Sequence, residues 1–243
     1  MATVDLQIHS HEVHAHDHHE HHEQSFIRKY IFSEDHKIIA KQFLISGMFW
    51  AILGGGMSML FRLQLGFPDA NLDWLKPLLG EWIENGKMNP EFYLALVTMH
   101  GTIMVFFVLT AGLSGTFSNF LIPLQIGARD MASGFLNMLS YWFFFASSVI
   151  MFVSIFIETG PASGGWVIYP PLSALPQAMS GSGLGMTLWL CSMSLFIVSS
   201  LLGSINYITT VINLRTKGMS FLRLPLTIWA FLITAIIGVL SFP

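Results

Sequence analysis

The sequence predicts an all-α membrane protein, a polytopic bundle of transmembrane helices. Three observations support this prediction: 53% of the residues are hydrophobic, only 10% are charged, and the apolar residues gather in long runs. A soluble domain has about 25% charged residues, whereas about 20 apolar residues of helix cross a hydrocarbon core. An ordinary soluble domain is excluded because five such runs follow one another. These predicted spans cover residues 40–64, 93–118, 135–157, 184–212 and 224–243.

Residues 1–30 precede the first run and are predicted to be a disordered tail. Between His9 and Gln24, imidazoles alternate with carboxylates, and such a composition is too polar to form a core. The tail could chelate divalent transition metals or be an incidental solvated segment. The absence of a fixed ligand spacing favours the second alternative. Residues 31–243 then form the membrane domain.

The first run contains Gly54, Gly55 and Gly56 and carries Arg62 near its end. Small residues let membrane helices approach closely, so these glycines are predicted to form packing faces. The guanidinium of Arg62 could bind a haem propionate or another ring substituent. It could equally extend to the membrane interface.

The second run contains His100, while the other nine histidines of the chain lie at or before His36. Ionisable groups inside a bilayer are rare and usually functional, and an imidazole there needs a polar partner on a neighbouring helix. Two interpretations stay open at this point. His100 is either a haem or metal ligand, or a donor that bridges two helices.

Polar residues gather around the start of the third run and along the fourth. Amides and hydroxyls in apolar helices can bind a row of water molecules, and a carboxylate at the entrance to that row could collect protons. Alternatively, these side chains could bridge helices, and the carboxylate could cap the next helix. The residues concerned are Asn119, Asp130, Asn137, Ser199, Ser200 and Asn206.

The basic residues predict the orientation in the membrane. Lys and Arg precede the first run and lie between the second and third and between the fourth and fifth, whereas the connections 66–92 and 158–183 are acidic or neutral. The positive-inside rule therefore places the N-terminus in the cytoplasm. No basic patch suggests a nucleic-acid partner.

Seven segments have the order and spacing of landmarks in one known family, subunit I of haem-copper cytochrome c oxidases. The sequence from Glu34 to Pro243 resembles the N-terminal portion of that subunit, and the loop around Asp130 resembles the aa3-type branch with a D-type proton channel. The segments are EDHKIIAKQFLISGMFW, LFRLQLGFP, HGTIMVFF, SNFLIPLQIGARDMA, GGWVIYPPLS, SSLLGSINYITTVINLR and PLTIWAFLITAIIGVLSFP.

The resemblance implies roles for three residues at a haem. His100 matches one axial ligand of the low-spin haem a iron. Arg62 matches the arginine that hydrogen-bonds the formyl group of that haem. Trp166 matches a tryptophan beside the haem propionates.

The resemblance also implies a proton channel. Asp130 matches its entrance, and Asn119 and Asn137 match asparagines that order water just inside it. Farther along the same row of ordered waters the family has further polar residues. The residues of this sequence that match them are Ser199, Ser200 and Asn206.

The implied activity is reduction of dioxygen to water with electrons from cytochrome c, coupled to proton pumping in the bacterial inner membrane. The implied partners are subunit II with its copper centre, subunit III and cytochrome c. No histidine follows His100, so ligands for the high-spin haem and copper B are expected only in the full-length subunit of twelve helices. We therefore expect an N-terminal fragment or a truncated gene model, inactive by itself.

Two other functions remain as alternatives. The chain could be a truncated, non-catalytic membrane protein that binds partner subunits without haem. It could also be a transporter, although inverted repeats are not evident and charges within the spans are rare.

The sequence departs from the family pattern in two places. Gln64 replaces a carboxylate, which puts in doubt a peripheral calcium or sodium site found in some members. Residues 133–135 are Ser-Gly-Phe in place of Phe-Pro-Arg, and Met138 replaces a second asparagine. Loss of that arginine removes a stabiliser of ionised Asp130 unless Arg129 substitutes for it.

Overall fold

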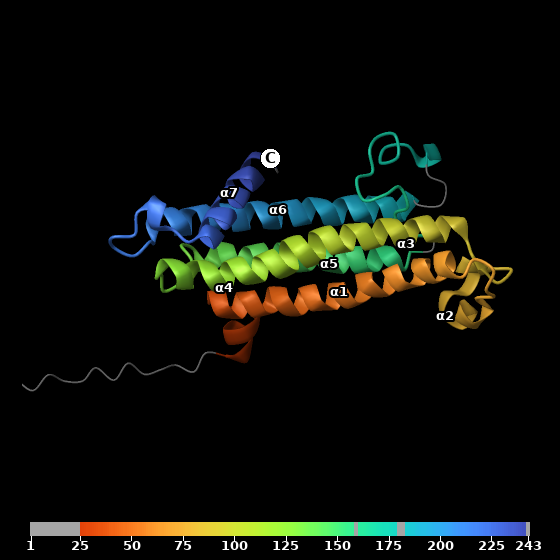
Figure 1. Ribbon diagram of the computed structural model, residues 1–243, viewed down its shortest axis with the longest axis horizontal. Helices are drawn as coiled ribbons and strands as arrows, with labels where there is room; N and C mark the ends of the chain where they lie inside the picture. The colour runs from red at the N-terminus through yellow and green to blue at the C-terminus, as the bar shows by residue number, and fades with distance from the viewer. Residues whose placement is uncertain (1–24, 158–159, 179–182, 242–243) are drawn as a thin grey trace, which may run out of the picture.

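A computed structural model of the chain describes residues 25–157, 160–178 and 183–241. Within these residues, four helices are apolar and long enough to cross a membrane, and a fifth apolar helix is shorter. The helices α1, α3, α4, α5 and α6 lie along one common direction in Figure 1, and α7 leans across α6. The predicted all-α bundle of five spans is confirmed. The histidine-rich part of the predicted tail, up to Gln24, lies outside the described residues.

The first span is α1 (His36–Gly66), which begins earlier than predicted. Its start is capped by Asp35, whose Oδ1 accepts a hydrogen bond from the Lys37 backbone N–H at 2.7 Å. Before it, residues Ile27–Ile31 form a π-helical turn, η1. Gln42 of α1 holds this turn, because its Nε2 donates to the carbonyls of Tyr30 and Ile31, both at 2.9 Å.

The second span is a continuous 37-residue helix, Pro90–Ile126. It consists of α3 (Pro90–Thr102), the π-helical segment η4 (Ile103–Ser114) and α4 (Gly115–Ile126). The sequence predicted an end at residue 118 because polar residues follow. The helix continues because those side chains bond to carbonyls one turn earlier: Ser118 Oγ to Ser114 O at 2.7 Å and Asn119 Nδ2 to Gly115 O at 2.8 Å.

The remaining spans begin and end within a few residues of their predicted limits. They are α5 (Gly134–Ile155), α6 (Gly183–Asn213) and α7 (Leu226–Ser241). Two short 3-10 turns lie in the connections, η5 (Pro176–Ala178) and η6 (Phe221–Arg223).

The connection between α1 and α3 folds into a small polar unit at one end of the bundle (Figure 1). It contains η2 (Asp73–Leu75), α2 (Lys76–Leu79), η3 (Gly80–Trp82) and the hairpin of β1 (Ile83–Glu84) and β2 (Lys87–Met88). Gln64, the residue that replaces a family carboxylate, ties this unit to α1, because its Oε1 accepts from the Met88 N–H at 2.9 Å.

The core forms where α1, η4, α5 and α6 meet. Its largest fully buried side chains are aromatic: Trp50, Phe107, Phe144 and Phe196. Serines add hydrogen bonds between α5 and α6, since Ser147 and Ser192 each donate to the other's carbonyl at 2.7 Å. Lipid provides little hydrophobic force between helices, so close packing and such hydrogen bonds hold the bundle together.

Two glycines set the distance between α1 and η4. A Cβ on Gly47 would lie 2.6 Å from Gly112 Cα, and a Cβ on Gly112 would lie 2.8 Å from Gly47 Cα. The two backbones are therefore in direct contact, and any larger side chain must separate them. In contrast, a Cβ on Gly55 would meet nothing within 4 Å.

We predict that Gly47→Ala destabilises the protein by about 1–3 kcal/mol, the usual cost of overpacking. The free energy of unfolding in mixed micelles, measured by titration with sodium dodecyl sulfate, checks this. Gly55→Ala is the matched control on the same helix and should leave stability unchanged or slightly higher. Equal losses in both variants would contradict the assigned contact.

Candidate functional site

His100 lies near the end of α3 and bonds to the neighbouring helix. Its Nδ1 is 2.8 Å from the backbone carbonyl oxygen of Gly54 in α1. A carbonyl can only accept, so the ring proton is on Nδ1 and the lone pair is on Nε2. Within the described residues, Nε2 has no hydrogen-bond partner. Metal-bound histidines usually have this arrangement, with one nitrogen held by a carbonyl and the other available to the metal.

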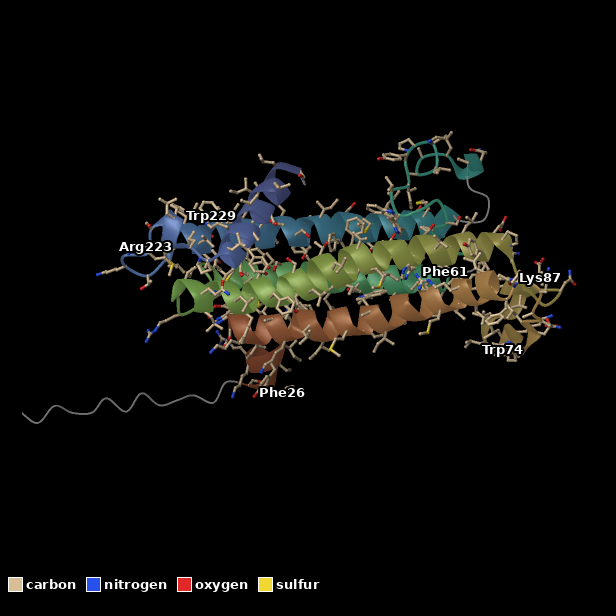
Figure 2. All side chains as sticks on the ribbon, in the orientation of Figure 1. Phe26, Phe61, Trp74, Lys87, Arg223 and Trp229 are labelled. Atoms are coloured by element: carbon tan, nitrogen blue, oxygen red, sulfur yellow. The ribbon has the colours of Figure 1, made fainter. Side chains whose placement is uncertain are left out.

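One aromatic ring contacts this imidazole, and another lies against the neighbouring residue of α3. The ring of Phe61 meets it edge-on, with centroids 5.6 Å apart and an angle of 69° between the planes. Figure 2 shows Phe61 toward one end of the bundle, with Phe26 toward the opposite end. A Cβ on Gly101 would lie 3.5 Å from Trp166, so this tryptophan packs against the helix directly beside His100.

The three residues predicted to bind haem are therefore only partly brought together. His100 is a residue of α3, and Trp166 packs against α3 at the next residue, Gly101. Trp166 remains 47% exposed. Arg62 follows Phe61 in α1, but it is exposed and its guanidinium makes no hydrogen bond or ion pair with a described residue. The haem contact of Arg62 stays a prediction.

At the opposite end of the bundle, Asp130 pairs with a histidine. Its Oδ1 accepts from His36 Nδ1 at 3.0 Å and from the Met131 backbone N–H at 2.7 Å. The Asp130 side chain is 44% exposed, whereas His36 is almost completely buried. Within the described residues, Arg129 forms no ion pair with Asp130. The side-chain partner of Asp130 is His36. Sequence reasoning missed His36, which lies 94 positions earlier in the chain.

Asp130 does not cap the helix that follows it. The cap of α5 is Ser133, whose side chain accepts from the Leu136 N–H at 3.2 Å. The carboxylate instead lies at the surface, where the connection between α4 and α5 meets the start of α1.

Asn119 and Asn137 are completely buried. Asn119 Nδ2 donates to Gly115 O at 2.8 Å and to Tyr207 Oη at 3.3 Å, but its Oδ1 has no partner in the described structure. Neither amide atom of Asn137 has one. A buried polar atom without a hydrogen bond costs about 1–3 kcal/mol, and proteins normally avoid this cost with internal water.

A cavity of about 250 Å³ lies between η4, α6 and α7, and its lining includes Gly115, Ser140 and Tyr207, which hydrogen-bond to Asn119 or Asn137. One water needs only about 10–15 Å³ of such volume. The cavity connects to Asn137 through two hydrogen bonds: Ser140 Oγ donates to Asn137 O and Ser199 Oγ donates to Ser140 O, both at 2.7 Å. Its hydroxyl-bearing lining includes Ser140, Ser199, Ser200, Ser204 and Tyr207.

Asn206 holds the loop that carries Asp130. Its Oδ1 accepts from the Ser133 N–H at 3.0 Å, and its Nδ2 donates to the Ser133 carbonyl at 3.1 Å. One turn later, Thr210 Oγ1 accepts from the Ala132 N–H at 2.9 Å. Both ends of the Asn206 amide are thus occupied by protein.

The fold and this site define an all-α integral membrane protein with a histidine in one span whose Nδ1 bonds to a carbonyl of the neighbouring helix. The family described as Cytochrome C and Quinol oxidase polypeptide I matches residues 38–243. The chain belongs to this family, so the predicted resemblance is confirmed.

Two relatives illustrate the similarity. The chain is 38% identical to the alternative cytochrome c oxidase subunit 1 of Bradyrhizobium diazoefficiens over 222 residues, which are 91% of this chain and 35% of that protein. It is 37% identical to cytochrome c oxidase subunit 1 of Candida albicans over 219 residues, 90% of this chain and 38% of that protein. The chain therefore spans a little over a third of the length of these curated relatives.

We predict that Asn206→Leu loosens the loop before α5, since it leaves the Ser133 N–H without a partner, while the Ser133 carbonyl still accepts from the Asn137 N–H at 3.1 Å. An unpaired buried group of this kind costs about 1–3 kcal/mol, so hydrogen exchange at residues 130–136 should accelerate by at least about fivefold. Exchange measured by mass spectrometry checks this. Asn213→Leu, at the exposed end of the same helix, is the control and should leave exchange in this loop unchanged. Unchanged exchange in Asn206→Leu would contradict the assigned role.

Proposed function

We propose that this chain forms the first part of subunit I of an aa3-type haem-copper terminal oxidase. Such an enzyme reduces dioxygen to water with electrons from cytochrome c and pumps protons. One observation carries the proposal: the His100 ring is held at Nδ1 by Gly54 O at 2.8 Å, which leaves Nε2 available. Family membership supports the same assignment.

In this proposal, His100 Nε2 would bind the iron of the low-spin haem a. That haem would supply an iron that accepts and passes single electrons. The Gly54 carbonyl orients the ring and makes Nε2 more basic. Phe61 covers one edge of the ring, and Arg62 would donate to the haem formyl group.

The other metal ligands would come from parts of the complete subunit other than residues 1–243. No histidine follows His100, and in this proposal the second ligand of the haem a iron would belong to such a part. The same holds for the ligands of the high-spin haem and copper B.

The proposed proton path begins at Asp130. His36 holds one carboxylate oxygen at 3.0 Å, while the exposed side of the group can receive protons from water. Inside, the unpaired amide atoms of Asn119 and Asn137 would bind waters. The row of waters would continue into the cavity beside Ser199 and Ser200. Asn206 serves the path by holding the loop that carries Asp130.

The chain would work with subunit II and its copper centre, subunit III and cytochrome c in the bacterial inner membrane. Lys37, Arg129 and Lys217 are at the end where α1 starts and where α4 and α6 finish. This asymmetry of basic residues supports a cytoplasmic N-terminus.

We predict that His100→Gln removes the low-spin haem absorption from the protein purified from its membrane, because an amide is a poor iron ligand. A reduced-minus-oxidised optical difference spectrum, normalised to protein, checks this. His36→Gln is the control and should retain the band. A normal spectrum in His100→Gln would exclude the ligand assignment.

We predict that Asp130→Asn lowers the rate of oxygen consumption by about 100-fold. This factor is at the lower end of the loss in rate expected when a positioned proton-transfer group is removed. Haem content should stay normal, because Asp130 and His100 lie at opposite ends of the bundle. Oxygen consumption with reduced cytochrome c is the measurement. Asp69→Asn, an exposed acid in the connection after α1, should retain full turnover, and full turnover in Asp130→Asn would refute the path.

A further inference from the structure

A groove on the outside of the bundle combines two lysines with apolar walls. It lies between the first turns of α1 and the adjacent face of α4 and has a volume of about 230 Å³. Its α1 side consists of the aliphatic parts of Lys37 and Lys41 together with Leu44, and its α4 side presents Phe117 and Phe120. None of these side chains belongs to the proposed haem site or proton path.

Helix geometry explains why these residues share one groove. Lys37, Lys41 and Leu44 are separated by four and three positions, so they lie above one another on one face of α1. Phe117 and Phe120 are likewise one turn apart on α4. The two helices are antiparallel and Gly115 lies against Phe43. Phe120 is therefore nearer the start of α1 than Phe117.

The apolar part of the groove is accessible from outside the bundle. The exposed fractions are 38% for Leu44, 49% for Phe117 and 43% for Phe120. In a bilayer these side chains face hydrocarbon. The start of α1, in contrast, lies at the level of the lipid headgroups, because a transmembrane helix ends where the hydrocarbon ends.

The two lysines have no ion-pair partner among the described residues, although two acids, Glu34 and Asp35, precede Lys37 in the chain. Both lysines are exposed. The nearest acid along the chain, Asp35, is occupied at the helix start, where its Oδ1 accepts from the Lys37 backbone N–H at 2.7 Å and lies 4.0 Å from His36 Nδ1. Two ammonium groups at headgroup depth therefore lack an anion.

We propose that this groove binds one anionic phospholipid. The phosphate lies between the ammonium groups of Lys37 and Lys41, and an acyl chain runs along Leu44, Phe117 and Phe120. Lysine interacts with a phosphate as a compact point charge. A lipid with net negative charge is preferred over a zwitterionic one, because the cation of a zwitterionic headgroup offsets its own phosphate and is repelled by the lysines. The assignment does not depend on the oxidase activity.

The test compares two lipids in the protein purified from its native membrane with any subunits that accompany it. The protein is placed in nanodiscs of equal palmitoyl-oleoyl phosphatidylglycerol and phosphatidylcholine, and native mass spectrometry counts the retained lipids. The wild type should retain phosphatidylglycerol preferentially. The double variant Lys37→Gln with Lys41→Gln should lose about fivefold of this preference for each lysine.

The matched control removes two lysines at the same end of the bundle but outside the groove, Lys29→Gln with Lys217→Gln. It should retain the wild-type preference. A second measurement locates the lipid: phosphatidylglycerol with a photoreactive acyl chain should label peptides of α1 and α4 that contain Leu44, Phe117 or Phe120.

Three results would overturn the proposal. They are equal retention of both lipids by the wild type, equal loss of preference in the two double variants, and no labelling of the groove peptides. The last result would mean that another protein segment covers the groove.

Discussion

The hydrocarbon core contains no water to hydrogen-bond a polar group, and this constraint determines most of the contacts in the bundle. Polar side chains in the spans find partners on their own or a neighbouring helix. Trp50 Nε1 donates to Ser148 Oγ at 3.0 Å, and Trp189 Nε1 donates to Thr102 Oγ1 at 3.1 Å. The same requirement explains why His100 bonds to α1. The same requirement points to bound water at Asn119 Oδ1 and at both amide atoms of Asn137, which have no partner in the described structure. A buried polar atom without a hydrogen bond costs free energy.

Close contact between α1 and the second span makes the His100 site possible. A helix carbonyl normally points along its own axis toward a donor four residues ahead, so a side chain on another helix reaches it only at short range. A Cβ on Gly54 would lie 3.0 Å from Ile103 Cγ2, which shows how little space separates the helices there. Of the three glycines predicted as packing faces, Gly54 provides both the close approach and the carbonyl that orients the imidazole. The prediction is wrong for Gly55 and Gly56, where a Cβ would meet nothing within 4 Å.

The two ends of the bundle hold different chemistry. His100, Phe61 and Trp166 lie toward the end that carries the polar unit after α1. His36 and Asp130 lie at the other end, with the two buried asparagines between. In the proposed function, this separation would let electrons and protons reach the interior by different routes. The lysine groove adds a third feature, on the outer face, where the protein meets lipid.

The sequence by itself determined the membrane class, the five spans and the candidates His100 and Asp130, because length, hydropathy and rare ionisable residues are local properties. Only the tertiary structure decided their partners. Gly54 lies 46 positions from His100, and His36 lies 94 positions from Asp130. The sequence offered Arg129, which is adjacent to Asp130, as the partner of that carboxylate. In the structure, the partner is the distant His36. The helix to Ile126 was also longer than predicted, because Ser118 and Asn119 bond to the backbone of their own helix, and hydropathy counts such residues only as polar.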